Sequence, residues 1–156
     1  MKYVNYNIVF QEIPDEVTLA INISHCPNHC PDCHSKYLWD DIGTSLTAAS
    51  LETLVAPYAE EITCVCFMGG DASPDEVQRL AEYIHKRYHG VIKTAWYSGK
   101  SLLPAGFDST TLDYLKLGPF ITSAGGLRSP HTNQRLYRLD NGEREDITFK
   151  MRRVAI

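Results

Sequence analysis

Three cysteines lie close together in residues 24–34, and this stretch constrains the chain more than any other. Cys26, Cys30 and Cys33 follow one another at offsets of four and then three residues. Thiolates are soft ligands that suit iron–sulfur clusters, zinc or Cu(I). Four thiolates close an ordinary cluster or a structural zinc site, whereas three leave one metal position without a protein ligand. Because an open position on a metal is where chemistry takes place, the stretch predicts a reactive metal centre.

The same three thiols leave two non-catalytic metal sites open as alternatives. A structural zinc ion could be completed by His29, His34 or a distant residue, although the spacing differs from the usual paired Cys-x-x-Cys units. A ferredoxin-like electron carrier is the second alternative, and the missing fourth neighbour counts against it. Both histidines are also compatible with ordinary solvated loop residues, and His34 could donate to a cluster sulfur.

Length and composition narrow the class of protein further. With 156 residues, the chain is expected to form a single domain over residues 1–156 with its own core. The net charge of -4 and the lack of a basic stripe give no reason to expect a nucleic-acid partner. No apolar run approaches the roughly 20 residues of a membrane-spanning helix, and residues 1–6 lack the features of a signal peptide. Five cysteines, an odd number, argue against a disulfide framework, so we expect a cytoplasmic protein without a membrane partner.

The hydrophobic pattern predicts alternating strands and helices through the first two thirds of the chain. Runs of apolar and β-branched residues predict strands at residues 17–23, 62–68 and 91–99, with 17–23 as the first strand. Apolar residues at spacings of three and four predict helices at residues 46–61 and 73–90. The fold class is therefore α/β with a parallel sheet, followed by an irregular C-terminal third.

Two further local signals refine this outline. Cys64 and Cys66 fall in the predicted buried strand, where a free cysteine behaves as a small hydrophobic residue, so we expect them in the core and not at the metal. Ser73 and Glu76 have the spacing of a capping box at the start of the second helix.

A glycine turn follows the strand at residues 62–68. Gly69, Gly70 and Asp71 form it, and paired glycines allow a backbone to approach a ligand closely. Since parallel strands end at the same edge of a sheet, this turn and the cysteine loop should lie close together. A side chain at Gly70 is then expected to obstruct a bound ligand without disturbing the thiolates. The alternative is that Gly70 supplies only a positive φ, in which case a substitution would destabilise the fold.

The C-terminal third carries weaker signals. A short strand is expected at residues 112–117, and a hairpin is expected from residues 136–139 and 147–151 around the turn at 140–142. Three polar side chains at residues 133–135 precede this hairpin. They could bind a carboxylate, a ribose or a partner backbone, and they are equally compatible with a surface turn.

The spacing of the three cysteines resembles that of the radical S-adenosylmethionine (SAM) enzymes. Residues 30–34 and the pair Trp39-Asp40 look like the Cys-x-x-Cys-His/Asn and Thr-Trp-Asp run of the glycyl-radical activating enzymes. Residues 116–120, 125–127 and 129–137 are similar to the C-terminal block of the anaerobic ribonucleoside-triphosphate reductase activating proteins. The likeness runs from about residue 3 to about residue 139.

This resemblance implies a [4Fe-4S] cluster that is held by the three cysteines and binds SAM at its open iron. The sequence departs from the family at Asp71, where a glutamate is usual, and at Ala72, where a proline is usual. It also departs at Asp32, where an aromatic residue often lies beside the adenine. The residues implied around the cluster and SAM are Cys26, Cys30 and Cys33 as ligands, with Gly69, Gly70, Asp71, His34, Ser98, Asn133 and Arg135 nearby.

The resemblance also implies a fold and an activity. The fold is an abbreviated radical-SAM partial (βα) barrel, because 156 residues are too few for the about 250 of a complete eight-unit barrel. The activity is reductive cleavage of SAM, which generates a glycyl radical on the anaerobic ribonucleotide reductase by hydrogen abstraction, with an external electron donor such as a flavodoxin. No side chain is expected to act as a general acid or base. Activation of another glycyl-radical enzyme, or radical chemistry on a small molecule, is the alternative within the enzyme class.

Overall fold

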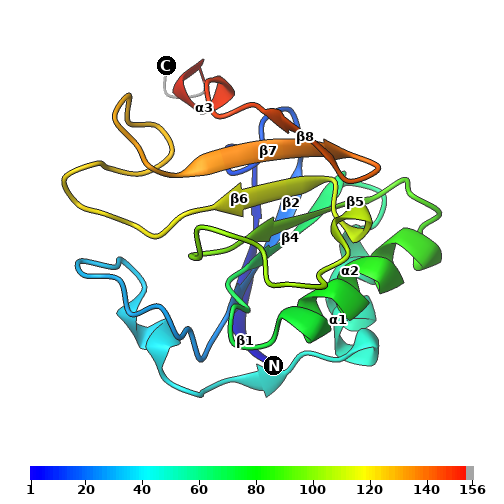
Figure 1. Ribbon diagram of the computed structural model, residues 1–156. Helices are drawn as coiled ribbons and strands as arrows, with labels where there is room; N and C mark the ends of the chain where they lie inside the picture. Colours follow the sequence, from blue (N-terminus) through cyan, green and yellow to red (C-terminus); the bar gives the residue numbers. More distant parts are fainter. Residues whose placement is uncertain (154–156) are drawn as a thin grey trace.

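One eight-stranded mixed sheet forms the centre of the computed structural model, which describes residues 1–153 (Figure 1). The strands are β1 (Lys2–Val9), β2 (Thr18–Ile23), β3 (Thr44–Ser45), β4 (Cys64–Met68), β5 (Lys93–Tyr97), β6 (Tyr114–Leu117), β7 (Arg135–Asp140) and β8 (Glu143–Asp146). Their spatial order is β3-β1-β2-β4-β5-β6-β7-β8. The four central strands, from β2 to β6 in that order, pair in parallel, and antiparallel pairs flank them on both sides.

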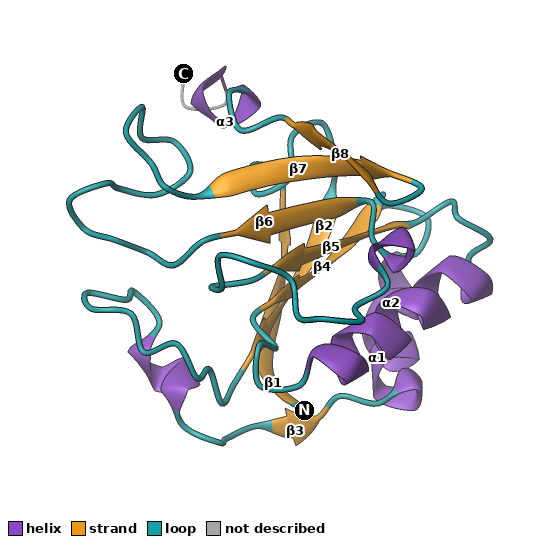
Figure 2. Cartoon of the chain, in the orientation of Figure 1, coloured by secondary structure: helices purple, strands orange, loops and turns teal. Residues whose placement is uncertain are grey.

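Two helices cover one face of the parallel strands, as Figure 2 shows. Helix α1 (Ala48–Val55) lies between β2 and β4 in the chain, and α2 (Pro74–Arg87) lies between β4 and β5. The α/β class with parallel pairing is therefore confirmed, whereas the partial barrel stays a prediction, because β3 and β8 are the two ends of the sheet within the described residues. No helix in this part of the chain is long and apolar enough to cross a membrane. The remaining elements are the 3-10 turns η1 (Lys36–Trp39), η2 (Ala56–Tyr58) and η3 (Ser109–Thr111), and the short helix α3 (Lys150–Arg153).

The parallel strands bury side chains on both faces. Leu19, Phe67 and Trp96 belong to the core cluster that packs against α1 and α2. Cys64 and Cys66 point to the opposite face and belong to a second buried cluster, so their predicted place in the core is confirmed. Burial raises the pKa of both thiols, which therefore stay protonated at neutral pH and are poor metal ligands.

A capping box begins α1, and the one predicted for α2 is wrong. The hydroxyl of Thr47 accepts from Ser50 N at 3.2 Å, and the hydroxyl of Ser50 accepts from Thr47 N at 2.7 Å. Ser73 makes no side-chain cap hydrogen bond at the start of α2. The carboxylate of Glu76 instead accepts a hydrogen bond from the positively charged amino group of Met1 at 3.0 Å.

Two strands differ from the sequence prediction. Strand β1 precedes β2 and pairs with it in antiparallel fashion, so residues 17–23 contain the second strand and not the first. The hairpin turn lies where it was predicted, since Asn141 and Gly142 both have a positive φ, of 51° and 86°. The second hairpin strand predicted at residues 147–151 is wrong. A two-residue turn pairs Asp140 with Glu143 at once, so β8 begins directly after the turn.

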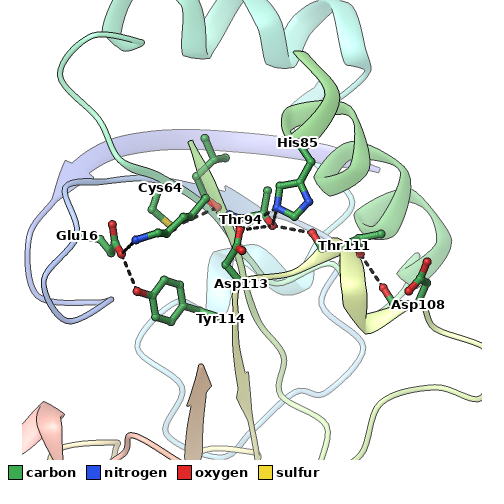
Figure 3. Close-up of polar contacts among 10 residues, drawn as sticks. Glu16, Cys64, His85, Thr94, Asp108, Thr111, Asp113 and Tyr114 are labelled. Carbon is green, nitrogen blue, oxygen red and sulfur yellow. Dashed lines mark hydrogen bonds and ion pairs between the residues drawn. The ribbon is translucent and has the colours of Figure 1, made fainter. Parts of the chain in front are cut away.

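A polar network holds the amino ends of the central strands together (Figure 3). The buried carboxylate of Glu16 accepts from Lys93 Nζ at 2.8 Å and from the Tyr114 hydroxyl at 2.6 Å. On α2, His85 Nε2 lies 2.8 Å from the carboxylate of Asp113. Lys93 and Tyr114 are the first residues of β5 and β6, so this network fixes the sheet at the edge opposite to the carboxyl ends.

Candidate metal centre

The three clustered cysteines line one pocket at the carboxyl edge of the parallel strands. Figure 1 shows the loop that carries them, in blue, and the loop between β6 and β7, in yellow and orange, projecting from the same edge of the sheet. The pocket has a volume of about 210 Å³ and includes residues from the ends of β2, β4, β5 and β6. Gly69 lines it too, which confirms that the cysteine loop and the glycine turn lie close together. Further lining residues are Asn28, Trp39, Asp71, Gly99, Lys116, Phe120 and Gln134.

Backbone hydrogen bonds hold the start of the cysteine loop against the segment that follows it. His25 N donates to the Asp40 carbonyl at 3.0 Å, and Cys26 N donates to the Leu38 carbonyl at 2.9 Å. Each of these bonds closes a loop of more than ten residues. The positions of the thiols therefore depend on the path of the chain through η1 as well as on their own spacing.

The residue directly before each cysteine adopts a left-handed backbone conformation. The φ angles are 60° at His25, 44° at His29 and 59° at Asp32. Among residues other than glycine, histidine, aspartate and asparagine enter this region most readily. The backbone thus gives a physical reason for Asp32 at the position before Cys33, where the resemblance leads one to expect an aromatic residue.

All three thiols are half-buried and free of disulfide bonds. The side-chain amide of Asn28 donates to Cys26 Sγ at 3.6 Å, and the backbone N–H of Ser35 donates to Cys33 Sγ at 3.4 Å. These two hydrogen bonds hold the sulfurs of Cys26 and Cys33 in place at the pocket. The pocket therefore presents three sulfur ligands that are accessible and free to bind a metal.

The donors around the pocket are compatible with a cluster. Within residues 1–153, no group of three or more His, Cys, Asp or Glu side chains stands close enough to hold one ion. The thiolates of a cubane bind different irons, so they do not need to converge on one point. Trp39 Nε1 is buried at the pocket and has no partner among the described residues, so it could donate to an inorganic sulfide. The three thiols and the unpartnered Trp39 Nε1 therefore suit a [4Fe-4S] cluster.

The two glycines after β4 have different surroundings. A Cβ at Gly69 would lie 3.1 Å from the carbonyl oxygen of Ile23, at the pocket wall. A Cβ at Gly70 would lie 2.7 Å from Val77 Cγ2 on α2, and Gly70 does not line the cysteine pocket. A side chain at Gly70 would point toward α2, which favours the alternative that this glycine serves the fold, and the obstruction of a ligand stays a prediction.

Asp71 joins the ends of β4 and β5. Its Oδ1 accepts from the buried Ser98 hydroxyl at 2.6 Å, and its Oδ2 accepts from Gly99 N at 2.8 Å and from Asn28 Nδ2 at 2.7 Å. Ser98 is 1% exposed and does not line the pocket, so it orients Asp71 and has no direct path to a ligand.

Lys116 is a site residue that sequence reasoning missed. Only 7% of it is exposed, and its ammonium donates to the carbonyls of Ser98 at 3.0 Å and Gly118 at 2.7 Å. Burial lowers the pKa of Lys116 to about 8, while the negative charges of Asp71, Cys30 and Cys26 oppose that shift. A lone lysine in the apolar strand β6 is the signal that could have identified it.

The predicted residues near the hairpin do not converge on the pocket. Asn133 is exposed and donates to the Pro119 carbonyl at 3.0 Å, and Arg135 is exposed and lies 3.8 Å from Asp146. Gln134, between them, is buried and lines the pocket. His34 is exposed, and its ring lies 5.7 Å from that of Phe120, at the edge of the site.

Residues 17–116 match the protein family described as the 4Fe-4S single cluster domain. The chain belongs to this family. The match begins just before β2 and ends at Lys116, so the 4Fe-4S single cluster domain contains the three clustered cysteines and the glycine turn but not the polar residues at 133–135. Searches of curated proteins and of solved structures give no match. Cys26, Cys30 and Cys33 are the candidate ligands of the single cluster.

Proposed function

We propose that this 4Fe-4S single cluster domain is a radical SAM activase that generates a glycyl radical on the anaerobic ribonucleotide reductase. The observation that carries the proposal is the pocket, in which three thiols face the ends of four strands and neither buried cysteine supplies a fourth ligand. A set of three protein ligands leaves one metal position open for a cosubstrate. The same family occurs in radical SAM activating enzymes, and the sequence resemblance points to the same class.

When bound, the [4Fe-4S] cluster supplies an electron and the open iron position at which SAM is bound and cleaved. The chain supplies the surroundings of that reaction. Gly69 brings the strand end to the pocket wall without a side chain in between. The ammonium of Lys116 places a positive charge near the thiolates and partly offsets their negative charge. Phe120 and Met68 add apolar surface that limits the access of water.

The proposed substrate is a protein segment, and the proposed electron donor is a flavodoxin. The pocket lies between the cysteine loop and the loop joining β6 to β7, both of which extend beyond the sheet edge (Figure 1). An extended segment that carries the target glycine would have to reach the site between these two loops. Activation of a different glycyl-radical enzyme, or a reaction with a small molecule, remains the alternative that the experiment must separate.

Anaerobic reconstitution with iron and sulfide tests the proposal. We expect a brown protein that cleaves SAM when reduced, and a doublet glycyl-radical signal in paramagnetic resonance when the anaerobic reductase is added. Omission of SAM, and separately of the reductase, provides the matched controls. A colourless protein that contains zinc would contradict the cluster, and a brown protein that never cleaves SAM would indicate an electron carrier. Cleavage of SAM without a radical on the reductase would reject this substrate and leave the alternative substrates.

A further inference from the structure

Asn28 connects the cysteine loop to the turn that follows β4. Its Nδ2 donates to Asp71 Oδ2 at 2.7 Å and to Cys26 Sγ at 3.6 Å. A carboxylate and a thiolate are both acceptors, so only the NH₂ end of the amide can face them. The two N–H groups of one nitrogen are thus shared between one carboxylate and one sulfur.

The end of β5 fixes this arrangement. Asp71 is held by the Ser98 hydroxyl and by Gly99 N, which leaves its carboxylate in one orientation toward Asn28. Gly99 also leaves the space that the amide occupies, since a Cβ there would lie only 2.5 Å from Asn28 Nδ2. The amide N–H is therefore placed on the Cys26 sulfur by contacts that do not depend on a bound metal.

We propose that Asn28 is a positioning residue that raises the reduction potential of the cluster held by Cys26, Cys30 and Cys33. Hydrogen bonds to the sulfurs of an iron–sulfur cluster are one of the factors that set its potential, because they stabilise the more negative reduced state. Ser35 N makes the corresponding bond to Cys33, but a side-chain substitution cannot remove a backbone donor. This inference rests on the cluster-binding part of the proposed function and not on SAM cleavage. It can therefore fail while the proposed SAM chemistry holds, and the reverse is also true.

The test is the midpoint potential of the anaerobically reconstituted protein, titrated with dithionite and redox mediators. At a fixed ambient potential, we expect the ratio of reduced to oxidised cluster to fall about tenfold in Asn28→Ala, which is about 59 mV for one electron. Iron content should stay at the wild-type level. The matched control is Asn7→Ala, which removes an exposed asparagine of β1 that does not line the pocket and should leave the potential unchanged.

A second variant displaces the amide without deleting it. Gly99→Ala puts a methyl group against Asn28 Nδ2, and Gly99 does not need the left-handed conformation that only glycine adopts easily. We expect a shift in the same direction, and no further shift when Gly99→Ala is added to Asn28→Ala. If Asn28→Ala fails to hold iron, Gly99→Ala decides the question. An unchanged potential in an iron-loaded single variant, or additive shifts in the double variant, would overturn the proposal.

Discussion

Replacement of Cys26, Cys30 or Cys33 by alanine is expected to abolish cluster binding in each case. Each thiol is one of only three in the pocket, and the other two cysteines are buried inside the sheet and cannot substitute for it. Two thiolates would leave two irons of a cubane without protein ligands, so we expect the protein not to retain the cluster. Iron and sulfide analysis after anaerobic reconstitution measures the loss, and reductive SAM cleavage should disappear with the iron.

The matched controls are Cys64→Ala and Cys66→Ala. Both residues pack in the core, so we expect full iron content and a loss of about 1 kcal/mol in the free energy of unfolding. Urea unfolding of the metal-free proteins measures that difference. A Cys64 or Cys66 variant that folds normally but lacks iron would show that the ligand assignment is wrong.

Local signals explain which parts of the fold could be predicted from the sequence. Strand β4 is a continuous apolar run and α2 has a regular apolar stripe, so each is specified within its own segment. Strand β1 was missed because its residues are only half-buried or exposed, so they show no clear hydrophobic pattern. Its conformation depends on antiparallel pairing with β2. The second hairpin strand was misplaced because Ile147 and Met151 lie in a turn and a helix that cover the core, instead of in a strand that pairs with β7.

The candidate site also combines residues that local sequence signals predict with residues that only the fold brings together. The cysteine triplet is local in the sequence, and the place of Gly69 follows from parallel strand topology, so both could be anticipated. Lys116 and Gln134 reach the pocket because the sheet brings β6 and the approach to β7 to it, and the contact of Asn28 with Asp71 joins segments that lie 43 residues apart in the chain. The block at 133–135 shows the limit clearly. Side chains alternate along the approach to β7, so Gln134 turns toward the pocket while Asn133 and Arg135 turn toward solvent. A shift of one residue in register would reverse which of them face the pocket.

Gly70→Val is expected to destabilise the whole domain, which is the second of the two outcomes that the sequence left open. Gly70 has a φ of +98°, a conformation that valine adopts only with strain. Its added Cβ would also lie 2.7 Å from Val77 Cγ2 and 3.3 Å from Met1 Sδ. Strain and overpacking together should lower the free energy of unfolding by roughly 2–6 kcal/mol, a large part of the 5–15 kcal/mol of a typical domain. Chemical unfolding of the metal-free protein measures this loss without any contribution from iron.

Gly90→Val separates the two causes of that loss. Gly90 also has a positive φ, of +75°, but a Cβ there would meet no atom within 4 Å. Its valine variant should therefore show only the backbone strain, about 1–3 kcal/mol, and the difference between the two variants reports the collision with Val77. A Gly70→Val protein as stable as the wild type would mean that the turn and α2 move apart freely. The pocket wall at Gly69 would then have to move with them, and a loss of SAM binding by that stable, iron-loaded variant would return Gly70 to the ligand site.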